Sequence, residues 1–579
     1  MSVPNYDPIE ADKIKGRECK HAIYIQGHSS MPGAIPDDMI FIKEIVHDTE
    51  GGKHPRIRMV ENYKRPFWIT KSGFRDHTET REWEDIDKLD RYESTQAGLV
   101  DAIKKALNIR SPSYFNIRKI ANDYPYIYGT DITPTTLIKN KYQNRYPDCI
   151  SECTMAVFDI ETDMVEGHEE PIYLSLTFKD RACIVVPKWY IDWFKDEYTY
   201  NSFASALKEH FYKRLPETAG ERNIDLEVVV AEGSVDAIKQ VFDRAHTWSP
   251  DFIAVWNINF DIPRILDVLE RYGVDAGDLL SDPHVPKKYR KAWYKEGPSQ
   301  KVTDTGEIVP RDWYDRWHTF YLPAGFYFVD QACIFWRLRM AAGKEPSYAL
   351  DSILTKYAGI KKLKNEKADQ MAGAKWHNYM QRFEPLEYGI YNLYDCISCE
   401  ILDEQPKMGD LRLSFYMQAE HSDYDVFNKQ PRRTVDDLHF TCLENGKVIA
   451  ATPGELKTEF DNHTTSRNDW IVTLPAHLVE RNGLPLLDDV PGHCTEVRGS
   501  VYDLDITSAY PTGEIVLNTS RQTTVAEVTR IEGLSEDVKR SIGVNLTGGS
   551  VNAIEICQRA MGAPTLEQLL ERFYKDHSQ

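Results

Sequence analysis

Long hydrophobic runs are missing from this 579-residue sequence. No apolar stretch approaches the ~20 residues that a membrane-spanning helix needs, so a helical membrane protein is not expected. The first residues, MSVPNYDPIEADK, are polar and lack the apolar stretch of a signal peptide. These absences predict an intracellular protein with no membrane partner.

Cysteine is sparse as well. The ten cysteines are scattered and do not have the spacing of a disulfide framework. Cys149 and Cys153 form one close pair, and Cys396 and Cys399 form a CxxC. Because no second pair completes a zinc site, we interpret all of them as reduced, structural thiols.

Positive charge is outweighed by negative charge. The net charge of −20 argues against a protein whose whole surface binds nucleic acid. It leaves room for a local basic groove, because binding depends on where the charges lie. Taken alone, each of two basic clusters is interpreted as an ordinary solvated face. They are Lys287, Lys288, Arg290 and Lys291, and Lys356, Lys361, Lys362 and Lys364.

The patterns that are present predict a mixed fold. An apolar content of 41% and an aromatic content of 11% are typical of a globular protein, and the length predicts roughly three to five domains. From residue 151 on, alternating strand and helix patterns predict an α/β and α+β multidomain protein with a mixed sheet. The expected strands are 172–178, 182–187 and Phe252 to Trp256, and the expected helices are about 234–246, from near Asp261, and about 385–404.

Two acids occur at the end of an apolar run. Asp159 and Glu161 follow the run that begins at Met155, and residues two apart on a strand point to the same face. Two adjacent carboxylates repel each other unless a cation neutralises them. Oxygen ligands favour Mg²⁺ or Mn²⁺. A surface strand edge would explain the pair about as well.

Two further acids are each ambiguous alone. Asp261 ends the polar turn from Asn257 to Phe260 and opens a helix, where it could be an ordinary N-cap. Tyr391 and Asp395 are four residues apart on an expected helix, so both project from one face. A hydrogen-bonded surface pair would give the same pattern.

Taken in order, the acids resemble the three motifs of the DEDD exonuclease superfamily, in the subgroup with a tyrosine beside the last aspartate. The resemblance implies a ribonuclease H-like 3′→5′ exonuclease domain in which Asp159, Glu161, Asp261 and Asp395 bind two Mg²⁺ or Mn²⁺ ions. Two such ions activate a water and hold the leaving 3′ oxygen. An ordinary tyrosine pKa near 10 makes Tyr391 a poor base, so we expect it to orient the water.

Residues beside the second acid could contact the DNA. Asn257 and Phe260 are expected to touch the frayed single strand, with Phe260 packing or stacking on a base. Support of the turn from within the core is an equally good explanation for both residues.

Downstream, the stretch from Tyr502 to Pro511 resembles motif A of family B DNA polymerases. The resemblance implies that Asp505 binds the polymerising metals, that Ser508 lies by the triphosphate and that Tyr510 lies beneath the incoming sugar. It covers about 120–530 and is closest to replicative polymerases of tailed bacteriophages, which implies the cytoplasm of an infected bacterium. The supporting stretches are Phe328 to Asp330, Ser347 to Leu350, Thr434 to Val448 and Leu517 to Ser520.

The chain departs from that family in two respects. Where phage members often have lysines after the position of Asp330, this chain has Arg337 and Arg339, which leaves the catalytic cation open. The fingers motif and the second palm motif are also missing, and the stretch from Thr303 to Gly306 does not replace the latter. Since a polymerase needs both palm aspartates and a fingers cation, we expect no synthesis by this chain alone.

These departures favour the N-terminal subunit of a split polymerase. Its partners would be DNA primer-template, a single-stranded 3′ end, and a second chain with fingers, second palm aspartate and thumb; a sliding clamp is also compatible. A capping box at Thr565 begins an apolar-striped helix that could dock on the second chain. The alternatives are a polymerase chain truncated after motif A, a stand-alone exonuclease with a relict palm and a non-catalytic replisome scaffold.

The expected domains follow from this interpretation. Residues 281–320 look like an irregular insertion that could hold a hairpin separating primer end from template. The domains are an N-terminal domain (1–150), the exonuclease domain (151–405), a linker returning to the N-terminal domain and palm entry (406–497), the first part of the palm with motif A (498–530), and a start of fingers or partner-docking region (531–579).

Overall fold

The computed structural model describes most of the N-terminal three quarters of the chain and two short strands beyond it. The described residues are 5–27, 34–78, 80–302, 308–339, 343–368, 371–405, 430–454, 543–546 and 549–552. The chain divides into two compact units, one made of residues 1–301 and 308–457 and the other of residues 302–307 and 458–579. In the second unit, β19 (Gly543–Leu546) pairs with β20 (Gly549–Asn552) in an antiparallel hairpin.

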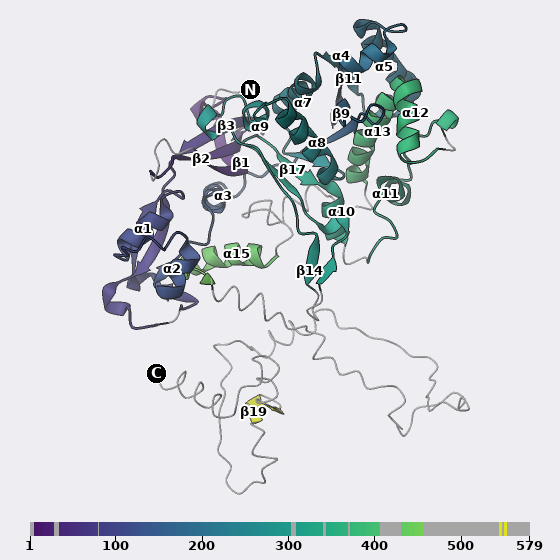
Figure 1. Cartoon of the computed structure of the whole chain (residues 1–579). Helices are drawn as coiled ribbons and strands as arrows, with labels where there is room; N and C mark the ends of the chain where they lie inside the picture. The colour runs from purple at the N-terminus through teal and green to yellow at the C-terminus, as the bar shows by residue number, and fades with distance from the viewer. Residues whose placement is uncertain are drawn as a thin grey trace, which may run out of the picture. The chain divides into compact units, whose positions relative to one another are not determined.

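A six-stranded mixed sheet forms the centre of the first unit (Figure 1). Its strands are β8 (Met155–Thr162), β9 (Pro171–Phe178), β10 (Arg181–Pro187), β11 (Asp225–Ala231), β12 (Phe252–Val255) and β17 (Tyr327–Asp330). They lie in the order β11-β10-β9-β8-β12-β17. The strands β8, β9 and β10 are antiparallel neighbours, while β12 is parallel to both β8 and β17, and β11 is parallel to β10.

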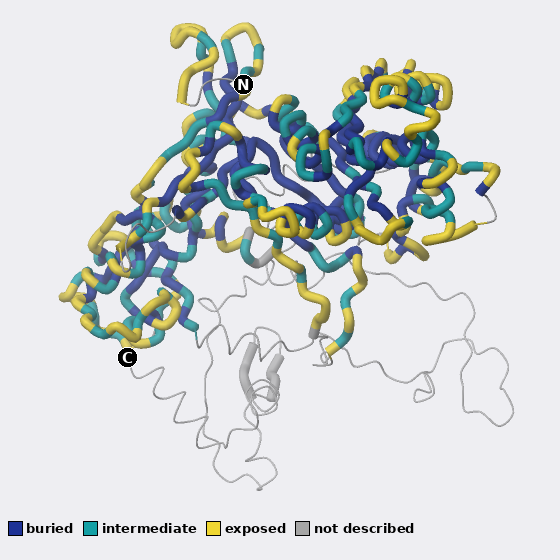
Figure 2. Tube along the Cα trace, turned by 45° about the horizontal axis from the view of Figure 1, so that its top comes forward, coloured by how far each residue is buried: buried dark blue, intermediate teal, exposed yellow. Residues whose placement is uncertain are grey.

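Helices cover both faces of this sheet. The side chains of Ala156, Phe158 and Ile160 on β8 pack in the cluster formed with α7 (Ser234–Trp248) and α8 (Ile258–Arg271). Val157 belongs to a cluster that includes residues of α13 (Pro385–Glu404). The alternation follows from the two-residue period of a strand. Figure 2 shows the sheet as a buried layer beneath helices with exposed outer faces. The other helices of this part of the chain are α4 (Lys188–Ile191), α5 (Tyr200–Arg214), α6 (Pro216–Glu221), α9 (Ala276–Leu280), α10 (Gln331–Arg339), α11 (Leu350–Tyr357) and α12 (Ala374–Phe383).

The N-terminal region contributes two smaller sheets to the same unit. One is the antiparallel sheet β1-β2-β3, and the other has the order β6-β4-β7. The strand β18 (Lys447–Ile449), which follows α15 (Gln430–Glu444), pairs with β5 and so returns the chain to this region. The remaining elements are β1 (Ile14–Gln26), β2 (Asp38–Asp48), β3 (Lys53–Glu61), β4 (Arg65–Thr70), β5 (Trp83–Asp85), β6 (Leu89–Ser94), β7 (Ile127–Tyr128), α1 (Leu99–Ala106), α2 (Ile117–Asp123) and α3 (Pro134–Arg145).

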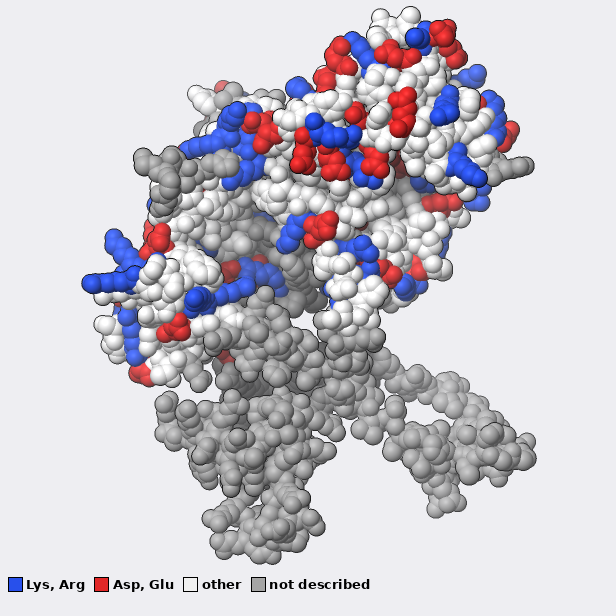
Figure 3. Space-filling view, in the orientation of Figure 1, with Lys and Arg blue, Asp and Glu red and all other residues white. Residues whose placement is uncertain are grey.

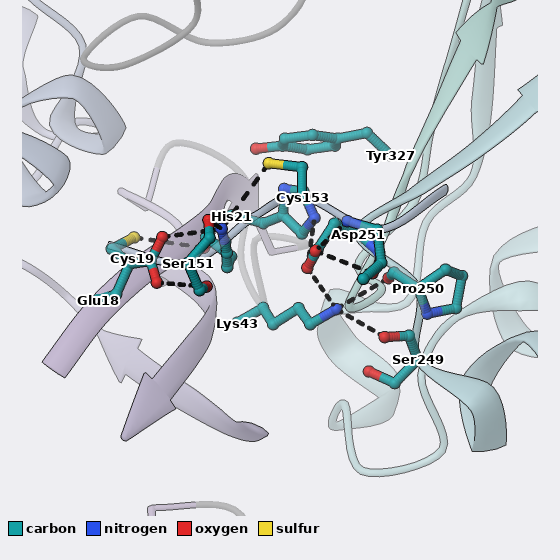
Figure 4. Close-up of polar contacts among 12 residues, drawn as sticks. Glu18, Cys19, His21, Lys43, Ser151, Cys153, Ser249, Pro250, Asp251 and Tyr327 are labelled. Carbon is teal, nitrogen blue, oxygen red and sulfur yellow. Dashed lines mark hydrogen bonds and ion pairs between the residues drawn. The ribbon is translucent and has the colours of Figure 1, made fainter. Parts of the chain in front are cut away.

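A buried lysine joins the N-terminal sheet to the central sheet (Figure 4). Lys43 on β2 is 2% exposed, and its Nζ donates to the carbonyl oxygens of Ser249 and Pro250, each at 2.8 Å. The same Nζ pairs with the Asp251 carboxylate at 2.8 Å. The other oxygen of Asp251 accepts from the backbone N–H and hydroxyl of Thr154, just before β8. One buried ion pair therefore fixes the starts of β8 and β12 against β2.

The insertion contains two nested strand pairs. The outer pair is β13 (Trp293–Lys295) with β16 (Thr319–Tyr321), and the inner pair is β14 (Gln300–Val302) with β15 (Ile308–Pro310). The rings of Trp293 and Tyr321 stack at 5.0 Å. The hydroxyl of Tyr294 donates to Asn259 at 2.9 Å, which ties the insertion to the first turn of α8.

The mixed α/β architecture with several sheets agrees with the sequence prediction. One boundary was predicted wrongly, because α8 begins at Ile258 rather than near Asp261. Asn257 occupies the N-cap position and Asp261 lies inside the first turn. In the part of the chain that the structure describes, no helix is both long enough and apolar enough to cross a membrane.

Candidate metal centre

Three carboxyl groups meet on the face of the sheet covered by α13. Asp159 and Glu161 project from β8, and Asp395 projects from α13, which packs against β8. One carboxylate oxygen of each residue lies within 4.8 Å of the others. Asp159 and Glu161 are partly buried and Asp395 is buried. This acidic triad could hold a metal ion.

Four polar side chains share the face of α13 that meets the triad. They follow helical spacing of three and four residues, which brings them onto one stripe. Two of them bind the β8 acids, since Asn392 donates to Asp159 at 2.6 Å and Tyr388 donates to Glu161. The four are Tyr388, Tyr391, Asn392 and Asp395.

Asp261 lies beside the triad without being part of it. Its Oδ1 accepts a hydrogen bond of 3.1 Å from the backbone N–H of Ile160, the residue between the two β8 acids. The strand β12 lies next to β8 in the sheet, so the turn after β12 delivers Asp261 to this edge. Asp261 is 3% exposed. The structure thus gathers all four predicted acids at one end of β8, with three of them in mutual reach.

Three of the four acids have pKa values raised above their usual range. Burial, followed by the charges of Asp261, Asp395 and Glu161, raises the pKa of Asp159 well above its usual range. Burial raises the pKa of Asp261 to about 8 and that of Asp395 to about 6. Bringing buried carboxyl groups together favours their protonated forms unless a positive charge neutralises them.

A lysine that the sequence interpretation assigned to a solvated face lies at this site. The Nζ of Lys362 donates to Asp395 at 2.6 Å and to the hydroxyl of Tyr391 at 2.8 Å. Its backbone N–H donates to Asp351 of α11 at 2.8 Å. The left-handed Gly359, two residues after the end of α11, turns the chain toward the site. Burial lowers the pKa of Lys362, but the neighbouring Asp395 and Tyr391 raise it overall to well above its usual range.

Lys362 is a cation at this site that the sequence interpretation did not identify. Arg339 lies elsewhere, with its guanidinium donating to the hydroxyl of Tyr357 at 3.2 Å. The sequence did contain a signal, because Lys362 belongs to the basic cluster near residue 360. That cluster resembled a surface patch because sequence alone does not show which member turns inward.

The donor set fits a hard divalent cation. Oxygen ligands from carboxylates are those that Mg²⁺ and Mn²⁺ prefer. The Oδ1 atom of Asp395 is buried without a hydrogen-bond partner among the described residues, although Lys362 binds the other oxygen. Each β8 acid likewise has one oxygen held by an α13 side chain, which leaves a second oxygen of each for a cation.

The two predicted DNA contacts lie at the start of α8. Asn257 is the N-cap residue, and its side chain makes no capping hydrogen bond. Phe260 is 44% exposed, and the guanidinium of Arg264 lies over its ring at 5.5 Å. Figure 3 shows that basic and acidic side chains are interspersed on the face in view. An exposed ring beside a cation is suited to an unstacked base.

The predicted polymerase residues lie outside the described part of the chain. These are Asp505, Ser508 and Tyr510, and the expected C-terminal helix after Thr565 falls there too. Comparison of the sequence with protein-family models and with curated proteins finds no match to either. The family resemblance therefore rests on the motifs themselves.

Proposed function

We propose that this chain is a metal-dependent 3′→5′ DNA exonuclease of the proofreading type. The observation that carries the proposal is the meeting of Asp159, Glu161 and Asp395 within 4.8 Å, beside a tyrosine and a lysine. When bound, two divalent cations would supply an activated water and stabilise the leaving 3′ oxygen. The four acids would hold those cations.

The residues around the acids have complementary roles in this proposal. Tyr391 orients the attacking water through its hydroxyl, since burial raises its pKa and makes it a still poorer base. Lys362 fixes that hydroxyl and adds a positive charge where negative charge develops on the phosphate. Phe260 and Asn257 contact the unpaired 3′ end.

The fold supports the same proposal. We interpret the central sheet as ribonuclease H-like, with β8, β9 and β10 as its antiparallel strands and β12 and β17 as the parallel pair. The order of these strands supports that interpretation. The acids then come from the central strand β8, the first turn of α8 and the helix α13 across the face.

The wider role rests on the sequence resemblance. We propose that the exonuclease serves a split family B DNA polymerase of phage type, to which this chain contributes Asp505, Ser508 and Tyr510. A second chain would supply fingers, second palm aspartate and thumb, and a clamp could join them. The pairing of β18 with β5 agrees with a chain that returns to the N-terminal region before entering a palm.

Primer degradation tests this function. The full chain is incubated with a 5′-labelled primer-template and Mg²⁺, with nucleotides present or absent, beside an Asp159→Ala/Glu161→Ala variant. We expect stepwise shortening from the 3′ end without extension, and no shortening by the variant. Extension would contradict the split-polymerase proposal, and equal shortening by the variant would contradict the site.

A further inference from the structure

The Glu161 carboxylate is held by a relay of two side chains from different helices. Tyr388 on α13 donates from its hydroxyl to Oε2 of Glu161. The same hydroxyl lies 2.7 Å from Nδ1 of His377 on α12, and that nitrogen is 3.6 Å from the carboxylate. The proposed reaction assigns no role to either Tyr388 or His377.

The chemistry of these groups sets the direction of the relay. An ionised carboxylate can only accept hydrogen bonds, and a hydroxyl has one proton to give. The proton of Tyr388 therefore points to Glu161, and Nδ1 of His377 carries the hydrogen that it donates to the hydroxyl oxygen. The relay runs from imidazole to phenol to carboxylate.

The relay is anchored so that it cannot move freely. Tyr388 is fully buried, and its ring stacks on Tyr391 at 6.1 Å with an interplanar angle of 7°. Gln381 on α12 donates to the carbonyl of Thr162 at 2.8 Å, and Tyr190 donates to the carbonyl of Gln381 at 2.9 Å. These bonds tie α12 to the end of β8.

Asp159 has its own hydrogen-bond partner, Asn392, one helical turn beyond Tyr388 on α13. Asn392 donates to its Oδ2 at 2.6 Å and accepts a hydrogen bond from Ser175 on β9. Tyr388 and Asn392 are four residues, or about one turn, apart on α13. The acids that they bind, Glu161 and Asp159, are two residues apart on β8. Each β8 acid is thus oriented by its own α13 side chain.

We propose that His377 and Tyr388 are positioning residues that hold Glu161 in the orientation in which it binds a divalent cation. They set the metal affinity of the site and leave the chemistry to other groups. This inference rests on the proposed metal-dependent exonuclease. Removal of such an outer partner of a metal ligand typically costs about 10- to 100-fold in metal affinity.

Direct Mn²⁺ binding tests the inference apart from activity. Mn²⁺ is titrated into the full chain, and the free ion is measured by electron paramagnetic resonance. Tyr388→Phe keeps the stacked ring and removes only the hydroxyl, so we expect its Mn²⁺ dissociation constant to rise about tenfold or more. The Mg²⁺ concentration for half-maximal primer shortening should rise in parallel, with the rate recovering at saturating Mg²⁺.

Variants of His377 separate positioning from general support of the fold. His377→Asn places an amide N–H near the position of Nδ1 and should bind Mn²⁺ like the wild type, whereas His377→Leu should weaken binding as Tyr388→Phe does. If Tyr388→Phe does not fold, this histidine pair decides the question. As a matched control, Tyr379→Phe removes a tyrosine hydroxyl from α12, the helix that carries His377. The Tyr379 ring packs on Phe383, with the ring centroids 5.1 Å apart.

The outcomes distinguish this inference from the proposed function. Unchanged Mn²⁺ affinity in Tyr388→Phe and His377→Leu, in a chain whose wild type shortens primers, would overturn the inference alone. A reduced rate at saturating Mg²⁺ with unchanged affinity would also overturn it, since the relay would then act on the chemistry. A wild type that neither binds Mn²⁺ nor shortens primers would overturn the proposed function itself.

Discussion

Replacing Lys43 should loosen the junction between the N-terminal sheet and the central sheet. Lys43→Met keeps most of the buried aliphatic volume but removes the ammonium that binds Asp251 and the carbonyls of Ser249 and Pro250. Although burial raises the pKa of Asp251, the charge of Lys43 and other nearby cations lower it to about 2, so the carboxylate stays charged at neutral pH. The variant therefore has a buried carboxylate without its main counter-charge.

The size of the effect follows from that loss. Removing one partner of a buried ion pair costs about 3–5 kcal/mol. Because each 1.4 kcal/mol is about tenfold in an equilibrium constant, local opening of the junction should become roughly a hundred to several thousand times more frequent. Because Thr154 keeps two hydrogen bonds to Asp251 in the variant, we expect a free-energy cost toward the lower end of this range.

Hydrogen exchange followed by mass spectrometry measures this opening directly. Peptides from β2 and from the segment at residues 249–255 should exchange faster in Lys43→Met. Lys53→Met, an exposed lysine on the neighbouring strand β3, is the control and should leave them unchanged. The double variant Lys43→Met/Asp251→Asn should recover part of the loss because neither charge remains. An exchange rate in Lys43→Met within about tenfold of that of the wild type would contradict this expectation.

Three further predictions concern the site, the pH response and the DNA contact. Lys362→Met should slow primer shortening at saturating Mg²⁺ by about 10²-fold or more, since a charge aimed at the developing transition state is lost; single-turnover kinetics checks this, and an unchanged rate contradicts it. Burial, helped by the charge of Lys43, lowers the pKa of His21 well below its usual 6.5. Below pH 6.5, His21 takes up a proton when the junction opens but stays neutral while the junction is closed. The free energy that neutral His21 contributes to the closed junction is therefore present above pH 6.5 and is lost as the pH falls. Exchange in β1, corrected for its intrinsic pH dependence, should rise from pH 7 to 5 in the wild type but not in His21→Leu. Phe260→Ala should raise the KM for a single-stranded 3′ end with little change in kcat, because about 1–3 kcal/mol of base stacking is lost; a fall in kcat alone would assign the ring to support of the turn.

Much of the central sheet follows from local sequence patterns. The apolar runs at β9, β10 and β12 and the helical patterns at α7 and α13 lie where the sequence predicted them. Such patterns depend on periods of two and of 3.6 residues, which a single segment reveals. The start of α8 was misjudged because Asp261 resembles a cap, whereas Asn257 takes that position.

The partners of the acids could not be predicted in the same way. Lys362 lies in a loop that is held by a hydrogen bond to Asp351 of α11. Because the neighbouring residues in the sequence are also basic, the segment resembled a solvated face. His377 and Tyr388 come from two helices that meet only after the chain has folded. The ordered acid motifs could be found in the sequence because strand and helix periodicity places each one, but the polar groups that orient them depend on tertiary packing.

We propose that exonuclease activity depends on Asp159 and Glu161. The most direct test is the time course of a 5′-labelled primer-template with the full chain and Mg²⁺, beside the Asp159→Ala/Glu161→Ala variant and a sample with chelator in place of metal. We expect stepwise loss of 3′ nucleotides with the wild type alone. Full-length primer in every sample, or equal shortening by wild type and variant, would contradict it.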